Sequence, residues 1–387
     1  MLGIILLLSP LVAAFAFALD IYIPTLPTVL KTFHTTQSML QLTLSVFLIT
    51  GGFGQLVIGP ISDHFGRRPV AMISALIFML ASIACALAPS VGLLIVGRML
   101  QSLGVCGLMV VANAVVRDLY DENDSAQVYS YLNGAIAFSP LFAPIIGGYL
   151  AVWLGWRSNF YFLALFALVT LLVICFLLKE SLQVQYRQRL NLKVFTHYAT
   201  LFKNPDFLFY ILCASGAVSC FFTFFSLSPY VLINLLHVPE QQFGLYFGIL
   251  GVTFFVGSLL AGFLVGRMGV EKIIRMGILL LLLGGLCMLL WYEIGGLSKG
   301  GFIWPMLFIG TGGSFLIGAG SAGAMAPFPE MAGTASAVLG ASEFIVSSIV
   351  GFLALLRSVQ SDMPLAFVAI VFACLMLIFK LVLTIKR

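Results

Sequence analysis

The chain is a succession of apolar runs separated by short polar segments, and each run is long enough for a membrane-spanning helix of about 20 residues. The runs do not alternate between apolar and polar residues, as transmembrane β-strands would. The expected fold class is therefore an all-α integral membrane protein with twelve transmembrane helices. We place these spans at residues 4–27, 38–60, 69–89, 92–115, 127–151, 157–178, 207–234, 241–265, 273–293, 301–325, 333–356 and 364–384.

Composition argues against a soluble enzyme. Of the 387 residues, 61% are hydrophobic and 9% are charged, whereas soluble domains contain about 25% charged residues. There is no Walker A loop and no GxSxG or HExxH motif, and the cysteines lack metal-binding spacing. We expect no enzyme activity, no cofactor and no metal. Because the basic residues are dispersed between apolar runs, we also expect no nucleic-acid partner.

The distribution of basic residues predicts the orientation in the membrane. With both termini in the cytoplasm, 14 of the 19 Lys and Arg residues lie on the cytoplasmic side, four lie opposite and Arg98 lies within the membrane. This excess agrees with the positive-inside rule. The first 18 residues are apolar like a signal peptide, but they have no basic n-region and the apolar pattern continues to Val29. We therefore interpret them as part of the first span.

An internal repeat indicates two related halves. Gly59 and Gly66, around the end of span two, recur 203 residues later as Gly262 and Gly269, around the end of span eight. Related halves predict a cavity at their interface that opens alternately to each side of the membrane. The expected organisation is an N-terminal six-helix half over residues 1–180, a cytoplasmic linker loop over 181–206 and a C-terminal six-helix half over 207–387.

Polar residues between spans two and three, together with an acid at the end of span four, suggest a conformational latch. Arg67 or Arg68 can pair with Asp118, and a carboxylate such as Asp63 can face the N-terminus of a neighbouring helix, where the dipole is positive. Such a cluster would hold the two halves in one state and break in the other. Alternatively, the arginines only set the topology. The predicted latch residues are Gly59, Asp63, Gly66, Arg67, Arg68 and Asp118.

Three segments resemble motifs of the major facilitator superfamily. They are residues 59–68 (GPISDHFGRR, motif A), 97–104 (GRMLQSLG, motif B) and 139–148 (SPLFAPIIGG, motif C, which the family associates with antiporters). Residues 19–27 (LDIYIPTLP) resemble the first-helix signature of the bicyclomycin/chloramphenicol-resistance (Bcr/CflA) branch of drug:proton antiporters. Segments 228–231 (SPYV), 242–244 (QFG) and 332–336 (AGTAS) resemble the same branch.

The resemblance implies the major facilitator fold and a proton-coupled antiporter that exports small amphipathic compounds, as in multidrug efflux. A metabolite or siderophore exporter and an uncoupled facilitator remain alternatives of the same fold. The expected partners are a small-molecule substrate, protons and the lipid bilayer. We expect a monomer in the bacterial cytoplasmic (inner) membrane.

Asp20 and Arg98 are the predicted proton-coupling residues. An ionisable residue inside the membrane is costly, by about 2.5–3.5 kcal/mol on insertion scales, and indicates function. At about 1.5 Å per residue, both lie about 10 Å below the outer surface. Asp20 would carry the proton and Arg98 would tune its release. The alternatives are a fixed structural pair, or an unpaired Asp20 at the water interface.

Two further groups complete the expected site. Glu343 lies about 15 Å into span eleven, near the midplane where transporters bind substrates, although a simple hydrogen bond to a neighbouring helix is the alternative. The candidate substrate-cavity residues are Tyr22, Gln101, Phe222, Tyr230 and Glu343. Span five contains prolines and glycines that can bend it and allow close packing, although such residues are common in membrane helices. These gating residues are Pro140, Pro144, Gly147 and Gly148.

Overall fold

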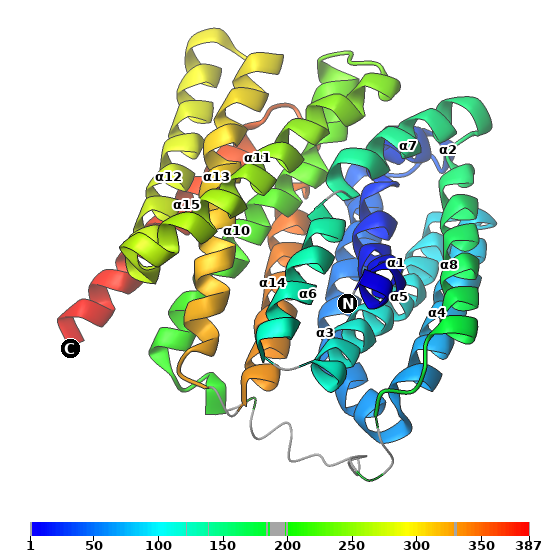
Figure 1. Cartoon of the computed structure of the whole chain (residues 1–387). Coiled ribbons are helices and arrows are strands. Elements are labelled where there is room, and N and C mark those ends of the chain that lie inside the picture. Colours follow the sequence, from blue (N-terminus) through cyan, green and yellow to red (C-terminus); the bar gives the residue numbers. More distant parts are fainter. Residues whose placement is uncertain are drawn as a thin grey trace. The chain divides into compact units, whose positions relative to one another are not determined.

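The computed structural model describes residues 2–120, 122–137, 139–182, 185, 198, 200–328 and 331–386, and every regular element in these ranges is helical (Figure 1). The elements before residue 180 are α1 (Leu2–Asp20), η1 (Ile23–Thr25, a 3-10 turn), α2 (Leu26–Thr32), α3 (Gln37–Phe65), α4 (Arg67–Ala86), α5 (Val91–Leu119), α6 (Glu122–Ala137), α7 (Ser139–Leu154) and α8 (Arg157–Leu177). Those after residue 200 are α10 (Pro205–Ser228), η3 (Pro229–Leu235, a π-helical turn), α11 (Glu240–Met268), α12 (Val270–Gly295), α13 (Lys299–Met325), α14 (Ala332–Ala354) and α15 (Met363–Lys386).

Within the described residues, each of the twelve expected spans overlaps one or more helices. Eleven helical segments of the described chain are long and apolar enough to cross a membrane. The expected fifth span, 127–151, instead falls on two helices, α6 and α7, and residue 138 between them lies outside the described residues. Pro140 is the second residue of α7, where a missing N–H has little cost, and Pro144 lies within the helix.

The first span differs from the single helix expected over residues 4–27. α1 ends at Asp20, and η1 and α2 complete the span to Thr32. Pro24 lies at the start of η1 and cannot donate a backbone hydrogen bond to the preceding turn. The sequence therefore places a break about two-thirds of the way along this segment, and the break positions the candidate site.

The helices form two compact units. Unit 1 is Met1–Asn191 together with Glu240–Leu245, and unit 2 is Leu192–Pro239 together with Tyr246–Arg387. The expected linker, 181–206, lies largely outside the described residues. The start of α11 groups with unit 1 because glycines allow close backbone approach. A Cβ atom at Gly148 would lie 2.8 Å from the carbonyl oxygen of Glu240, and one at Gly244 would lie 2.9 Å from the Cα of Ile145.

The predicted internal repeat is visible in the backbone. α3 and α11 each contain 29 residues and start 203 residues apart. Each ends at a glycine with positive φ, 103° at Gly66 and 79° at Gly269. The turn before each helix contains a histidine in the left-handed region, His34 with φ 48° and His237 with φ 53°. These matching turns indicate that both units follow the same chain plan.

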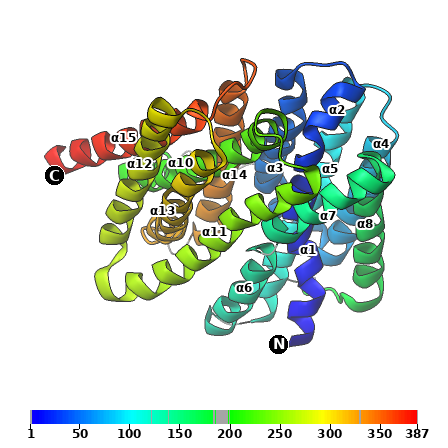
Figure 2. The same cartoon turned by 90° about the horizontal axis from the view of Figure 1, so that it is seen from above.

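Within each unit the same helices pack together. α4 packs on α5 and α8, and the corresponding α12 packs on α13 and α15 (Figure 2). In unit 1 the contact between α4 and α5 depends on Gly104, because a Cβ atom there would lie 2.6 Å from the backbone nitrogen of Phe78. In unit 2 a Cβ atom at Gly312 would lie 2.7 Å from the carbonyl oxygen of Gly277. Small residues at such crossings are the usual means of close helix packing in membranes.

We expect Gly104→Ala to destabilise the protein by about 1–3 kcal/mol, because the added methyl group must push α4 away from α5. Gly92→Ala in the same helix is the matched control, since nothing lies within 4 Å of a Cβ atom there. Thermal unfolding of the purified protein in detergent measures the difference. Equal melting temperatures for the two variants would show that the α4–α5 contact is not as tight as described.

Candidate functional site

The candidate site is built around the break that follows α1. Where a helix ends, its last carbonyl groups lose their partners and must be satisfied inside the protein. Two buried side chains do this. Arg98 Nη1 of α5 donates to the carbonyl oxygen of Ala18 at 2.8 Å, and Asn159 Nδ2 of α8 donates to the carbonyl oxygen of Ile21 at 3.0 Å. A guanidinium at a helix C-terminus is also favoured by the helix dipole.

Asp20, the last residue of α1, contacts the predicted gating helix. Its side chain is buried, with 2% of the residue exposed. Its Oδ2 accepts a hydrogen bond of 2.8 Å from Ser139 Oγ, which belongs to the first residue of α7. The carboxyl group therefore connects the break in the first span directly to the fifth span. Ser139 was not predicted as a partner of Asp20, because the two residues are 119 positions apart and no local pattern links them.

Arg98 and Asp20 do not form the direct pair that their similar depths suggested. In the described part of the chain no ion pair within 4.0 Å joins them. Besides Ala18, Arg98 binds Gln101 Oε1 at 2.5 Å, and its guanidinium carbon lies 4.2 Å from the ring centre of Phe47. Residue spacing gives the depth of a side chain, but not the direction in which it leaves the helix.

The candidate cavity residues are divided between the units. In unit 1, Tyr22 is fully buried and its ring centre lies 5.3 Å from the guanidinium carbon of Arg98. Gln101 is also fully buried, and its Nε2 donates to Ser82 Oγ at 2.8 Å, so both ends of its amide are engaged within α4 and α5. In unit 2, Phe222 lies in α10, Tyr230 in η3 and Glu343 in α14. A cavity shared by all five remains a prediction.

At the opposite end of unit 1, Arg67 lies between two carboxylates. Its Nε donates to Asp118 Oδ2 at 2.9 Å, and its Nη1 donates to Asp63 Oδ1 at 2.5 Å. Only 6% of the Arg67 side chain is exposed. Gly66 makes the tight turn before it, with φ 103°, whereas nothing lies within 4 Å of a Cβ atom at Gly59.

Glu180 is a member of this cluster that the sequence analysis missed. Its Oε1 accepts the backbone N–H of Arg67 at 2.8 Å and its Oε2 accepts that of Arg68 at 3.2 Å, so the carboxylate caps the N-terminus of α4. Asp63 was expected to face a helix N-terminus, but Glu180 fills that position. We name Asp63, Arg67, Asp118 and Glu180 the Arg67 cluster. The hydrogen bonds described above join residues of unit 1, and a latch between the halves stays a prediction.

The glycines of α7 bring this helix close to two other segments. A Cβ atom at Gly147 would collide with the carbonyl oxygen of Ile21 in the break after α1, and one at Gly148 would meet the start of α11. Nearby, Thr28 Oγ1 donates to Glu240 Oε1 at 2.8 Å. α7 is therefore in close backbone contact with the break after α1 at one position and with the start of α11 at the next.

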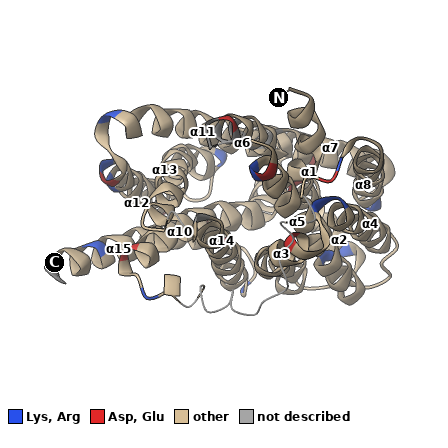
Figure 3. Ribbon diagram, turned by 60° about the horizontal axis from the view of Figure 1, so that its bottom comes forward, with Lys and Arg blue, Asp and Glu red and all other residues tan. Residues whose placement is uncertain are grey.

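Most charged residues gather near helix ends (Figure 3), whereas the buried Arg98 lies within α5 and the buried Asp20 lies at the break after α1. Among the described residues no group of three or more His, Cys, Asp or Glu side chains is arranged to hold a metal ion. The arrangement is that of polar groups at a helix break inside an apolar bundle, which is how membrane transporters hold ions and substrates.

Comparison with known proteins agrees with this arrangement. The sequence profile of the Major Facilitator Superfamily matches residues 8–351. A bicyclomycin resistance protein homolog of Haemophilus influenzae is 30% identical over 374 residues, which make up 95% of this chain and 90% of that protein. A chloramphenicol resistance protein of Pseudomonas aeruginosa is 32% identical over 336 residues, or 86% of this chain and 79% of that protein.

The fold is likewise shared with a solved transporter structure. A D-xylose-proton symporter superposes with a TM-score of 0.76 over 97% of both chains, at 17% sequence identity. This likeness confirms the expected twelve-helix fold, and the apolar helices identify a multi-pass membrane protein. The chain belongs to the Major Facilitator Superfamily, and its relatives there include bicyclomycin and chloramphenicol resistance proteins.

Proposed function

We propose that this protein is a proton-coupled antiporter that exports small amphipathic compounds by alternating access. It acts as a monomer in a bacterial cytoplasmic membrane, with both termini in the cytoplasm. The observation that carries the proposal is the buried Asp20 carboxyl at a helix break, hydrogen-bonded to α7. The names of the relatives, which refer to chloramphenicol and bicyclomycin resistance, favour drug-like substrates over a dedicated metabolite.

Asp20 is the proton carrier in this proposal. An ionised carboxylate accepts from Ser139, whereas a protonated one can donate to the same hydroxyl, since a serine hydroxyl both donates and accepts. Protonation therefore changes the contact between α1 and α7 without removing it. A membrane potential of 100 mV supplies about 2.3 kcal/mol per charge moved, enough for about fiftyfold accumulation of substrate.

Arg98 donates to the carbonyl group that is freed at the break, and it can also bind the Asp20 carboxylate in a second conformation. Its Nη1 is engaged with Ala18 and Gln101, while its buried Nη2 has no hydrogen-bond partner among the described residues. An unpaired buried donor is costly. In the alternate conformation Nη2 is available to Asp20 or to a polar group of the substrate, and this would favour release of the proton.

The other predicted residues surround the same transport path. Tyr22, Phe222 and Tyr230 supply aromatic faces for flat apolar or cationic compounds. Glu343 supplies a negative charge for a cationic substrate or a second proton. The Arg67 cluster stabilises one conformation of the N-terminal half, and α7 seals the path when its glycines are in contact.

We expect Asp20→Asn to abolish drug-dependent proton release, because the amide cannot carry a proton. The measurement is the collapse of ΔpH in energised everted vesicles when a panel of drugs that includes chloramphenicol is added. Glu293→Gln, which removes an exposed carboxyl near the end of α12, is the control and should behave as wild type. An unchanged drug-dependent collapse in Asp20→Asn would refute the assignment of the proton carrier. No response in the wild type would favour a metabolite exporter or an uncoupled facilitator.

Arg67→Gln should slow transport about tenfold or more, since a charge-assisted hydrogen bond contributes about 1.5–3 kcal/mol. Asp118→Asn should have a similar effect, and the double variant should be little worse than either, because both single changes break the same contact. Arg117→Gln removes the adjacent exposed charge and serves as the control. The transport rate of each variant is measured in vesicles at matched protein levels. Additive losses in the double variant would argue against a shared contact.

Gly148→Leu should increase the passive proton permeability of vesicles, because the larger side chain keeps α7 away from Glu240. Gly134→Leu in α6 is the matched control, since nothing lies within 4 Å of a Cβ atom at that position. The rate of ΔpH decay without substrate is measured for the Gly148→Leu and Gly134→Leu vesicles. If Gly148→Leu vesicles are as tight as those of the control, α7 does not act as a seal.

A further inference from the structure

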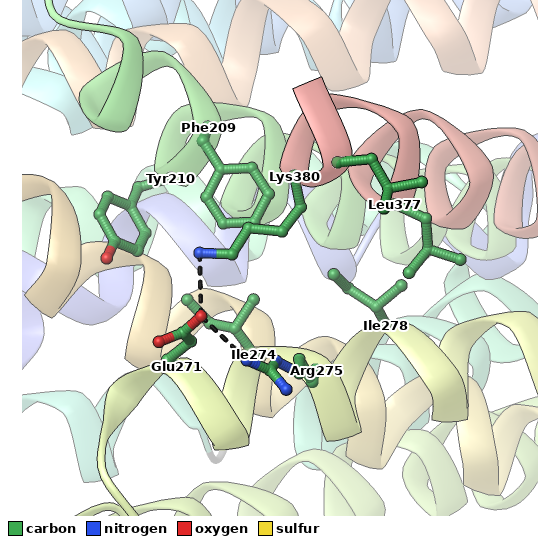
Figure 4. Close-up of a pocket in the computed structure, with 9 residues that line it drawn as sticks. Phe209, Tyr210, Glu271, Ile274, Arg275, Ile278, Leu377 and Lys380 are labelled. Carbon is green, nitrogen blue, oxygen red and sulfur yellow. Dashed lines mark hydrogen bonds and ion pairs between the residues drawn. The ribbon is translucent and has the colours of Figure 1, made fainter. Parts of the chain in front are cut away.

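A second polar site lies in unit 2, far along the sequence from the Asp20 break. It is a cavity of about 130 Å³ between one end of α10, the first turns of α12 and the last turns of α15 (Figure 4). Its lining is mostly apolar but carries three charged side chains, Glu271 and Arg275 from α12 and Lys380 from α15. Nothing in the proposed transport mechanism uses this cavity.

The charged side of the cavity has an excess of one positive charge. Lys380 Nζ and Arg275 Nη2 both lie 3.1 Å from the same oxygen, Glu271 Oε1. Lys380 also lies over the ring of Phe209, with Nζ 5.4 Å from the ring centre. One carboxylate thus serves two cations, and 65% of the Arg275 side chain is exposed. The ammonium and guanidinium groups retain donors that an external anion can use.

The apolar side of the cavity continues from the charged side along the same helices. Ile278 lies two turns after Glu271 in α12, and Leu377 lies one turn before Lys380 in α15. Figure 4 shows these side chains beside the charged group. The neighbouring surface of both helices exposes large apolar residues, which is the surface that lipid chains cover in a membrane protein. These exposed residues include Leu279, Leu283, Ile378, Leu381 and Val382.

We infer that this cavity binds an anionic phospholipid, with the phosphate on Lys380 and Arg275 and an acyl chain along Ile278 and Leu377. A phospholipid is the membrane component that joins an anion to a long apolar chain in this order. The predicted orientation places the cluster at the cytoplasmic leaflet, where basic pockets between helices bind anionic head groups. Glu271 competes with the phosphate for both cations, so it sets the affinity of the site.

Because Glu271 competes with the phosphate, removing the cations and removing the carboxylate should change lipid affinity in opposite directions. The full chain, purified in detergent, is titrated with phosphatidylglycerol, and bound lipid is counted by native mass spectrometry. The double variant Lys380→Gln/Arg275→Gln should weaken binding about tenfold or more. Glu271→Gln should tighten it severalfold, because both cations are then free for the phosphate. Arg267→Gln is the charge control, since Arg267 lies outside the cavity, over the ring of Phe263.

Two further titrations identify the source of the phosphate. Phosphatidylcholine tests the requirement for net negative charge, and glycerol 1-phosphate supplies the phosphate without chains. The proposal expects weak binding of both. Equal binding of phosphatidylcholine, equal binding of glycerol 1-phosphate, or no gain in Glu271→Gln would overturn it. Melting temperatures without lipid verify that each variant is folded. If the double variant is unfolded, the lipid affinity of Glu271→Gln compared with that of Arg267→Gln still tests the proposal.

Discussion

A bilayer offers no water to a free backbone carbonyl, so a break in a spanning helix must be satisfied from within the protein. In unit 1 this constraint applies at the end of α1, and the packing of the helices around that point follows from it. Arg98 and Asn159 reach the freed carbonyl groups of Ala18 and Ile21 from two different helices. These bonds hold α1, α5 and α8 together around the break. The same bonds fix the position from which Asp20 meets α7.

Stability and the proposed proton coupling therefore depend on the same few groups. A regular helix through residues 20–25 would use the carbonyl group of Ala18 for a backbone hydrogen bond, and that carbonyl now accepts from Arg98. The glycines of α7 allow this helix to approach the break closely enough for the hydroxyl to reach the carboxylate. In the proposed mechanism, a change of charge at Asp20 is transmitted to a helix that is in backbone contact on both sides. This short path suits a transporter that links a proton to a movement of helices.

The two units repeat the backbone plan but not the electrostatics. The left-handed turns at His34 and His237 and the equal lengths of α3 and α11 show a common plan. Unit 1 carries the Arg67 cluster after α3, whereas unit 2 has Gly266 at the position 203 residues after Asp63. In unit 2 the corresponding end instead contains Glu271, placed between two cations above an apolar cavity. The repeated scaffold thus carries a different charged cluster in each unit.

The approximate spans, the two related halves and the buried ionisable residues could be predicted from the sequence, because apolar run length, glycine spacing and depth along a helix are local properties. It also indicated Asp118 as a partner for Arg67. Three contacts became known only from the folded chain: Arg98 binds a carbonyl group rather than Asp20, Ser139 donates to Asp20, and Glu180 caps α4. The reason is geometric. Depth follows from a rise of about 1.5 Å per residue, but the direction of a side chain depends on helix rotation and on breaks such as that at Pro24, which packing between distant segments determines.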